Sequence, residues 1–90
     1  MVIILEISYD EFLKIGHDII DLRDNIKYQR KHLPNSLNIS LYTLIANPSN
    51  YLKESINYLL VCDYGLKSKK ASEILNRMGY QAYSLKNGYK

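Results

Sequence analysis

The sequence predicts an α/β fold in which a small parallel sheet of about five strands is flanked by helices on both faces. Short runs of strand character alternate with helically spaced segments along the chain. The central runs are apolar at consecutive positions, which is typical of parallel strands buried on both faces. A chain of 90 residues, 47% of them hydrophobic and 23% charged, is sufficient for one core. We therefore expect residues 1–90 to form a single domain.

The N-terminal segment predicts an edge strand followed by a short helix. Residues 2–5 form the short apolar run of the strand. Ser8 and Glu11 have the spacing of a capping box, in which each side chain bonds the backbone amide of the other residue. The helix that follows is expected to end at Gly16, where a left-handed conformation costs little.

The next segment predicts two strands joined by a short helical connection. Residues 19–22 form a buried strand whose polar Asp21 needs a partner. Residues 25–31 are polar and suit a helical turn or two before Pro34. Residues 36–39 then return to strand character.

The middle of the chain predicts a short helix at residues 41–46, closed by turn residues at 47–50. The spacing of Tyr51, Leu52 and Ile56 predicts a further helical turn. Residues 58–61 are the most continuous apolar strand of the chain.

A longer helix and a last strand complete the predicted fold. From Ser68 the apolar residues follow a helical period, and Gly79 predicts the end of the helix. Residues 82–85 form the last strand.

The charge and composition exclude several classes of function. No stretch of about 20 apolar residues is present, so no membrane-spanning segment is expected. The net charge of +3 includes clusters of basic residues that favour small anions, but no nucleic-acid signature or metal-ligand spacing accompanies them. The single cysteine cannot form an internal disulfide, and the N-terminus lacks the basic region of a secretory signal, so we expect a cytoplasmic protein.

The residues that can carry chemistry follow the strand at 58–61. Cys62 begins the loop Cys62-Asp63-Tyr64-Gly65-Leu66-Lys67-Ser68 and lies where strand, loop and helix bring several backbone amides together. Such amides favour the thiolate, which is the nucleophilic form of cysteine. Gly65 allows the loop to curl, Ser68 can cap the helix or bond the sulfur, and Lys67 can hold an anion. The plainer interpretation is an inert cysteine that closes a core strand.

The loop and three further motifs resemble those of the rhodanese-like sulfurtransferase family. Its active loop, Cys-x-x-Gly-x-x-Ser, is matched by Cys62, Gly65 and Ser68. Asp21-Leu22-Arg23 is similar to the family's Asp-Val-Arg, residues 32–39 to its Gly-His-Ile-Pro-Gly-Ala-x-Asn-Ile, and residues 85–88 to its Leu-x-Gly-Gly. The four motifs occur in the family's order along nearly the whole chain.

The resemblance implies transfer of a sulfane sulfur through a persulfide on Cys62, which the loop amides from Asp63 to Ser68 would hold. The donor would be a small anion such as thiosulfate or a protein persulfide, and the acceptor a thiol, possibly on a protein. Two half-reactions imply ping-pong kinetics, with no metal or organic cofactor. Asp21, Arg23 and His32 would support the structure.

Asp63 departs from the family pattern, because thiosulfate-using members often carry arginine after the cysteine. The change of two charge units predicts that thiosulfate is a poor donor, although Lys67 opposes the carboxylate. Asn87 replaces a glycine and suits the left-handed region.

Two other functions compete with sulfur transfer. A phosphatase-type loop would need arginine at the position of Ser68, so its phosphate clamp is missing. A non-catalytic module that senses oxidation of Cys62 or binds a partner stays open as the alternative.

Overall fold

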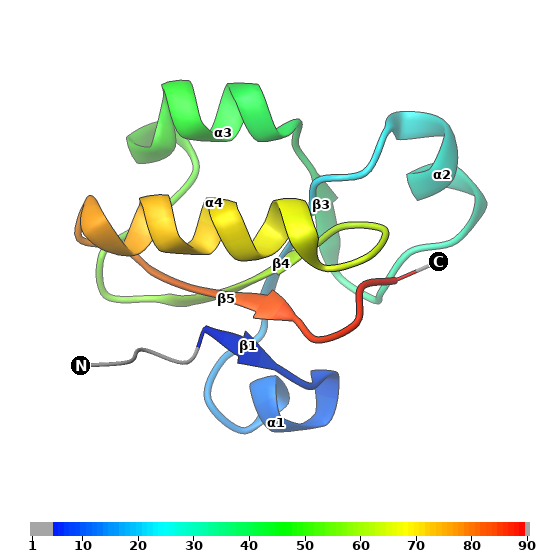
Figure 1. Cartoon of the computed structure of the whole chain (residues 1–90), viewed down its shortest axis with the longest axis horizontal. Helices are drawn as coiled ribbons and strands as arrows, with labels where there is room; N and C mark the ends of the chain where they lie inside the picture. Colours follow the sequence, from blue (N-terminus) through cyan, green and yellow to red (C-terminus); the bar gives the residue numbers. More distant parts are fainter. Residues whose placement is uncertain (1–4, 90) are drawn as a thin grey trace.

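Five parallel strands form a sheet in the order β1-β5-β4-β2-β3 in the computed structural model, which describes residues 5–89 (Figure 1). The strands are β1 (Glu6–Ile7), β2 (Asp18–Asp21), β3 (Ser36–Asn38), β4 (Asn57–Val61) and β5 (Gln81–Leu85). Every neighbouring pair is parallel. The predicted fold class is therefore confirmed.

Helices cover both faces of this sheet (Figure 1). They are α1 (Tyr9–Leu13), α2 (Asn25–Arg30), α3 (Leu41–Ala46), the 3-10 helix η1 (Pro48–Asn50) and α4 (Leu66–Arg77). Leu60 packs on one face with Leu44 of α3 and Leu75 of α4, whereas Leu59 packs on the other face with Phe12 of α1. Successive β4 side chains thus enter opposite cores, as a strand buried on both faces requires. No helix among residues 5–89 is long and apolar enough to cross a membrane.

The first helix confirms the predicted capping box but not its predicted end. Ser8 Oγ accepts from the Glu11 amide at 3.1 Å, and Glu11 Oε1 accepts from the Ser8 amide at 3.3 Å. The hydrogen bonds from Ser8 lower the pKa of Glu11. Gly16 is not in the left-handed region, since the positive-φ glycines among residues 5–89 are Gly65, Gly79 and Gly88. A Cβ atom on Gly16 would instead lie 3.0 Å from the Asn57 Cβ atom, so a side chain here would fit only if its neighbours shifted slightly.

The predicted strand at residues 2–5 lies largely outside the described residues. The first described strand is Glu6–Ile7, which pairs with Ser84 and Leu85 of β5. Leu5 precedes that strand, and its carbonyl accepts a hydrogen bond from the Ser84 amide at 2.6 Å.

Two predicted helix positions in the second half are wrong. The helical turn expected from Tyr51 to Ile56 is replaced by η1, because Pro48 at its first position already has a helical φ. The long helix α4 begins at Leu66 rather than Ser68. Gly65, with a φ of 86°, reverses the chain early, and its carbonyl accepts the first helical hydrogen bond from the Lys69 amide.

Candidate active site

Cys62 lies at the carboxyl end of β4 with its side chain facing the start of α4. The residue is 4% exposed, and the backbone amides of Gly65 and Ser68 donate to its sulfur at 3.1 and 3.3 Å. Both donors belong to the first turn of α4 or to its cap. Their N–H groups and the positive end of the helix dipole favour a negative charge on this sulfur. Two amide donors and the end of a helix at one sulfur form an arrangement that suits an anion.

Two buried hydroxyl groups extend the contacts of the sulfur. The Cys62 thiol donates to Ser68 Oγ at 3.2 Å, and Ser68 Oγ lies 2.6 Å from Ser84 Oγ. Both serines are fully buried, and both hydroxyls can donate to the Gly65 carbonyl at 3.3 Å. Ser68 is thus a sulfur-binding residue in the first turn of α4, not its cap. Ser84 was missed from the sequence, although a serine in an otherwise apolar strand was a visible signal.

The segment after β5 closes over the backbone of the cysteine loop. The Tyr89 amide donates to the Cys62 carbonyl at 2.8 Å. A Cβ atom built on Gly88 would lie only 2.2 Å from the Asp63 carbonyl oxygen, and φ at Gly88 is 75°. Asn87, with a φ of 67°, adopts the left-handed region as the sequence predicted. Glycine at position 88 is therefore required both by the turn and by contact with the loop.

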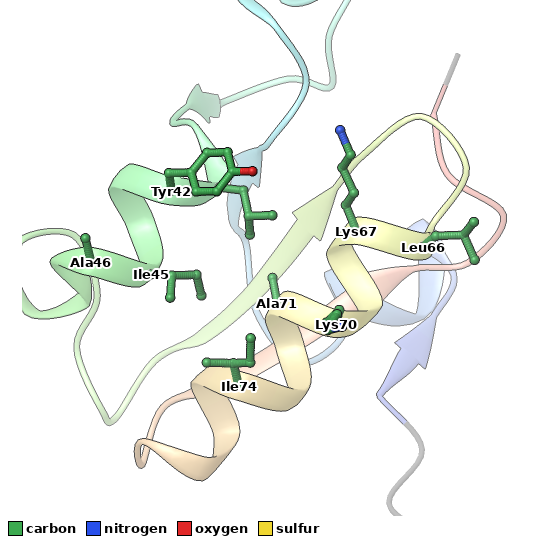
Figure 2. Close-up of a pocket in the computed structure, with 9 residues that line it drawn as sticks. Tyr42, Ile45, Ala46, Leu66, Lys67, Lys70, Ala71 and Ile74 are labelled. Atoms are coloured by element: carbon green, nitrogen blue, oxygen red, sulfur yellow. The ribbon is translucent and has the colours of Figure 1, made fainter.

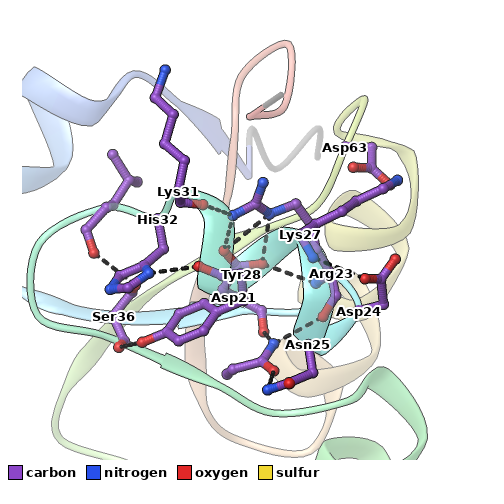
Figure 3. Close-up of polar contacts among 12 residues, drawn as sticks. Asp21, Arg23, Asp24, Asn25, Lys27, Tyr28, Lys31, His32, Ser36 and Asp63 are labelled. Atoms are coloured by element: carbon purple, nitrogen blue, oxygen red, sulfur yellow. Dashed lines mark hydrogen bonds and ion pairs between the residues drawn. The ribbon is translucent and has the colours of Figure 1, made fainter.

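Asp21 and Arg23 form a buried ion pair beside the loop (Figure 3). The Asp21 carboxylate accepts from Arg23 Nη2 at 2.7 Å and from the Arg23 amide at 2.9 Å, which supplies the partner that a buried Asp21 needs. The side-chain hydrogen bond to Asp21 raises the pKa of Arg23. Arg23 also donates to the Lys31 carbonyl, and its guanidinium lies 4.9 Å from the centre of the Tyr89 ring. The pair thus connects β2, the end of α2 and the closing segment.

His32 contacts the end of α2 rather than the cysteine loop (Figure 3). Its Nδ1 atom lies 2.7 Å from the Tyr28 carbonyl oxygen. Its ring stacks on the Tyr28 ring, with 3.9 Å between the two ring centres. The Tyr28 hydroxyl in turn donates to the Ser36 carbonyl. These contacts give His32 a place in the turn between α2 and β3.

The carboxylate next to the cysteine has a partner that the sequence did not indicate. Asp63 Oδ2 accepts from Lys27 Nζ of α2 at 2.9 Å (Figure 3), whereas Lys67 was the cation expected to oppose it. This hydrogen bond raises the pKa of Lys27. On the alkaline side the ion pair is therefore kept at neutral pH and is lost as the pH rises through the raised pKa of the lysine. Lys67 has no ion-pair partner among residues 5–89.

A cavity of about 390 Å³ lies in front of Cys62. Three cations, Arg23, Lys27 and Lys67, and two carboxylates, Asp24 and Asp63, line it together with apolar residues. A smaller hollow of about 160 Å³ is lined by the loop itself, namely by Cys62, Asp63, Tyr64, Leu66 and Lys67. The loop residues predicted from the sequence therefore meet at one place. Two of them, Tyr64 and Leu66, are 66% and 76% exposed at its rim.

The other predicted residues differ in their distance from the sulfur. Gly65 and Ser68 contact it, and Asp63 and Lys67 line its cavity. Among residues 5–89 no cluster of three or more His, Cys, Asp or Glu side chains suitable for a metal ion is found.

The structure is thus an α/β domain whose single cysteine lies at the carboxyl end of a parallel strand and accepts hydrogen bonds from two backbone amides. The family model described as the rhodanese-like domain matches residues 8–90, and the chain belongs to this family.

Individual relatives agree with this assignment. The chain is similar to a tRNA sulfurtransferase of Thermoplasma acidophilum, with 35% identity over 65 residues, which are 72% of this chain and 13% of that protein. The chain thus spans about an eighth of the length of this curated relative. A crystal structure of a rhodanese-like domain protein from Staphylococcus aureus has a TM-score of 0.79 and 25% identity, covering 92% of this chain and 85% of the other. A rhodanese homologue from Thermus thermophilus has a TM-score of 0.69 and 30% identity, covering 89% and 87%.

Proposed function

We propose that this protein is a sulfurtransferase that carries a sulfane sulfur as a persulfide on Cys62. The observation that carries the proposal is the pair of hydrogen bonds from the Gly65 and Ser68 amides to the Cys62 sulfur, at 3.1 and 3.3 Å. An anion held by fixed amides needs no reorganisation when it forms, which is the main source of electrostatic stabilisation in enzymes. The sulfurtransferase related to this chain supports the same chemistry.

The reaction consists of two displacements at sulfur. The Cys62 thiolate attacks the outer sulfur of a donor, a new S–S bond forms, and the donor's own S–S bond breaks. The departing group, sulfite from thiosulfate or a thiolate from a persulfide, takes the electron pair of that bond. A thiol acceptor then removes the outer sulfur and regenerates the Cys62 thiolate. The two steps give ping-pong kinetics.

Loading of Cys62 tests this function directly. Incubation with thiosulfate, and separately with glutathione persulfide, is expected to add one sulfur atom to the intact chain, as measured by mass spectrometry. A thiol added afterwards should remove the sulfur, and Cys62→Ser should gain none, because the chain has no second cysteine. If neither donor loads the wild-type chain, the proposed function is wrong and the non-catalytic module that senses oxidation or binds a partner gains support.

The charge of Asp63 is expected to control the use of thiosulfate. Asp63→Arg should raise kcat/KM for thiosulfate by about tenfold at low salt and less at high salt, because it replaces a carboxylate by a cation beside Cys62. Lys27→Met should have the opposite effect, since it leaves the Asp63 carboxylate without its partner. Steady-state kinetics with both variants measure this effect. Equal kcat/KM values for both variants and the wild type would contradict it.

A further inference from the structure

A groove of about 630 Å³ lies between α3 and α4 (Figure 2). Its walls include Tyr42 and Ile45 from α3, and Leu66, Lys67, Lys70 and Ile74 from α4. Tyr42 is 86% exposed, and Ala71, which is fully buried, forms part of the floor. The chain thus exposes a continuous apolar surface outside the cavity of Cys62. An apolar groove between two helices is a surface on which a partner segment can bury apolar side chains.

Positive charge lies at the edge of the groove, whose own surface is almost entirely apolar. Lys67 and Lys70 are its charged residues, no carboxylate lines it, and neither lysine has an ion-pair partner among residues 5–89. Figure 2 shows Lys67 extending from the first turn of α4 at the end of the groove. Apolar walls beside unpaired lysines complement a segment that combines apolar side chains with carboxylates.

The groove adjoins the cavity in front of Cys62. Leu41, Tyr42 and Lys67 line both spaces. A protein segment bound in the groove would therefore lie next to the cavity of the sulfur. The shared lining connects the groove with sulfur exchange rather than with an unrelated partner.

We propose that the groove between α3 and α4 docks the protein that delivers sulfur to Cys62 as a cysteine persulfide, through an apolar segment that carries carboxylates. This proposal rests on the proposed sulfurtransferase function. A protein donor is favoured over a small dianion because the apolar groove beside the cavity can hold a peptide segment, whereas a small dianion would leave the groove empty. The Cys62 thiolate attacks the outer sulfur of the donor persulfide. The donor's S–S bond breaks, its cysteine leaves as a thiolate, and the hydrogen of the outer sulfur stays on the new Cys62 persulfide.

Three persulfidated peptides of equal length test the recognition. The first surrounds its cysteine with leucine, phenylalanine and glutamate, the second replaces glutamate by lysine, and the third replaces the apolar residues by serine. Transfer to Cys62, followed by intact mass, is expected to be about tenfold faster in kcat/KM for the first peptide than for the second. The third peptide should also be slower than the first. Equal values for all three peptides would overturn the proposal.

Variants of the groove locate the effect. Lys70→Glu should reverse the preference between the acidic and the basic peptide, and Ile74→Ser should slow the acidic apolar peptide. Neither residue lines the Cys62 cavity, so loading by glutathione persulfide should keep the wild-type rate. Lys53→Glu makes the same charge change at an exposed residue outside the groove and should alter nothing. Unchanged peptide preference in Lys70→Glu would overturn the proposal.

Binding without sulfur separates this proposal from the proposed function. The acidic apolar peptide with a serine in place of its cysteine should shift the amide NMR signals of α3 and α4, and Lys70→Glu should remove these shifts. Failure of every donor to load the wild type would refute sulfur transfer, and with it a sulfur donor as the occupant. If glutathione persulfide loads Cys62 but the peptide shifts no amide NMR signals of α3 and α4, only the docking proposal is refuted. Sedimentation that shows a dimer lost in Ile74→Ser would assign the groove to a second copy of the chain and overturn the proposal.

Discussion

Asp21→Ala is expected to lower the free energy of unfolding by about 3–5 kcal/mol, because it removes one partner of a buried ion pair. Asp21 is 1% exposed and Arg23 is 6% exposed, so the guanidinium would stay buried without its counter-charge. Its remaining contacts, the Lys31 carbonyl and the Tyr89 ring, do not neutralise it. Urea denaturation followed by circular dichroism measures the loss.

Two further variants test whether the loss of stability comes from the unpaired buried charge of Arg23. Adding Arg23→Met to Asp21→Ala should recover part of the lost stability, because the double variant has no uncompensated charge. Lys27→Met breaks the exposed ion pair with Asp63 and should cost much less, since water screens that pair. Similar losses in Asp21→Ala and Lys27→Met would contradict a special cost at the buried pair.

The elements predicted correctly have strong local signals. The apolar run predicted as a strand at 58–61 is one residue shorter than β4. The helix predicted at 41–46 has the bounds of α3, because Ser40 caps its start and Asn47 and Pro48 follow its end. The incorrect elements depend on weaker local signals or on contacts across the fold. Gly16 was predicted to end a helix by its backbone conformation, whereas the structure places it close to Asn57, where an added Cβ atom would have little room.

The candidate site shows the same division. The spacing from Cys62 to Gly65 and Ser68 is local, and the structure places both amides on the sulfur. Lys27 and Ser84 lie far from the loop in sequence and reach it only through the fold. Ser84 meets Ser68 because β5 pairs with β4 in a fixed register beneath α4, and Lys27 meets Asp63 because α2 follows the neighbouring strand. Such contacts require knowledge of the strand order, which the sequence alone did not supply.

Gly88→Ala is expected to destabilise the protein and to slow loading of Cys62. An alanine at a φ of 75° costs about 1–2 kcal/mol through the left-handed backbone alone. Its Cβ atom would also lie 2.2 Å from the Asp63 carbonyl oxygen and 2.6 Å from the Tyr64 Cα atom. These are backbone atoms, which can move only if the cysteine loop moves. The added overlap should therefore lower the free energy of unfolding by about a further 1–3 kcal/mol, which is the usual cost of overpacking a core.

Gly79→Ala separates the two causes, because Gly79 has a φ of 99° but its nearest neighbour, Glu54 Oε1, would lie 3.8 Å from the new Cβ atom. It should lose only the cost of the backbone conformation and should accept sulfur from glutathione persulfide at the wild-type rate. Denaturation and loading of the two variants, measured side by side, give the contribution of the contact with the loop. Equal stability losses, with Gly88→Ala still loading normally, would mean that the closing segment does not position Cys62. A slower loading confined to Gly88→Ala would show that the turn after β5 holds the loop in its sulfur-binding conformation.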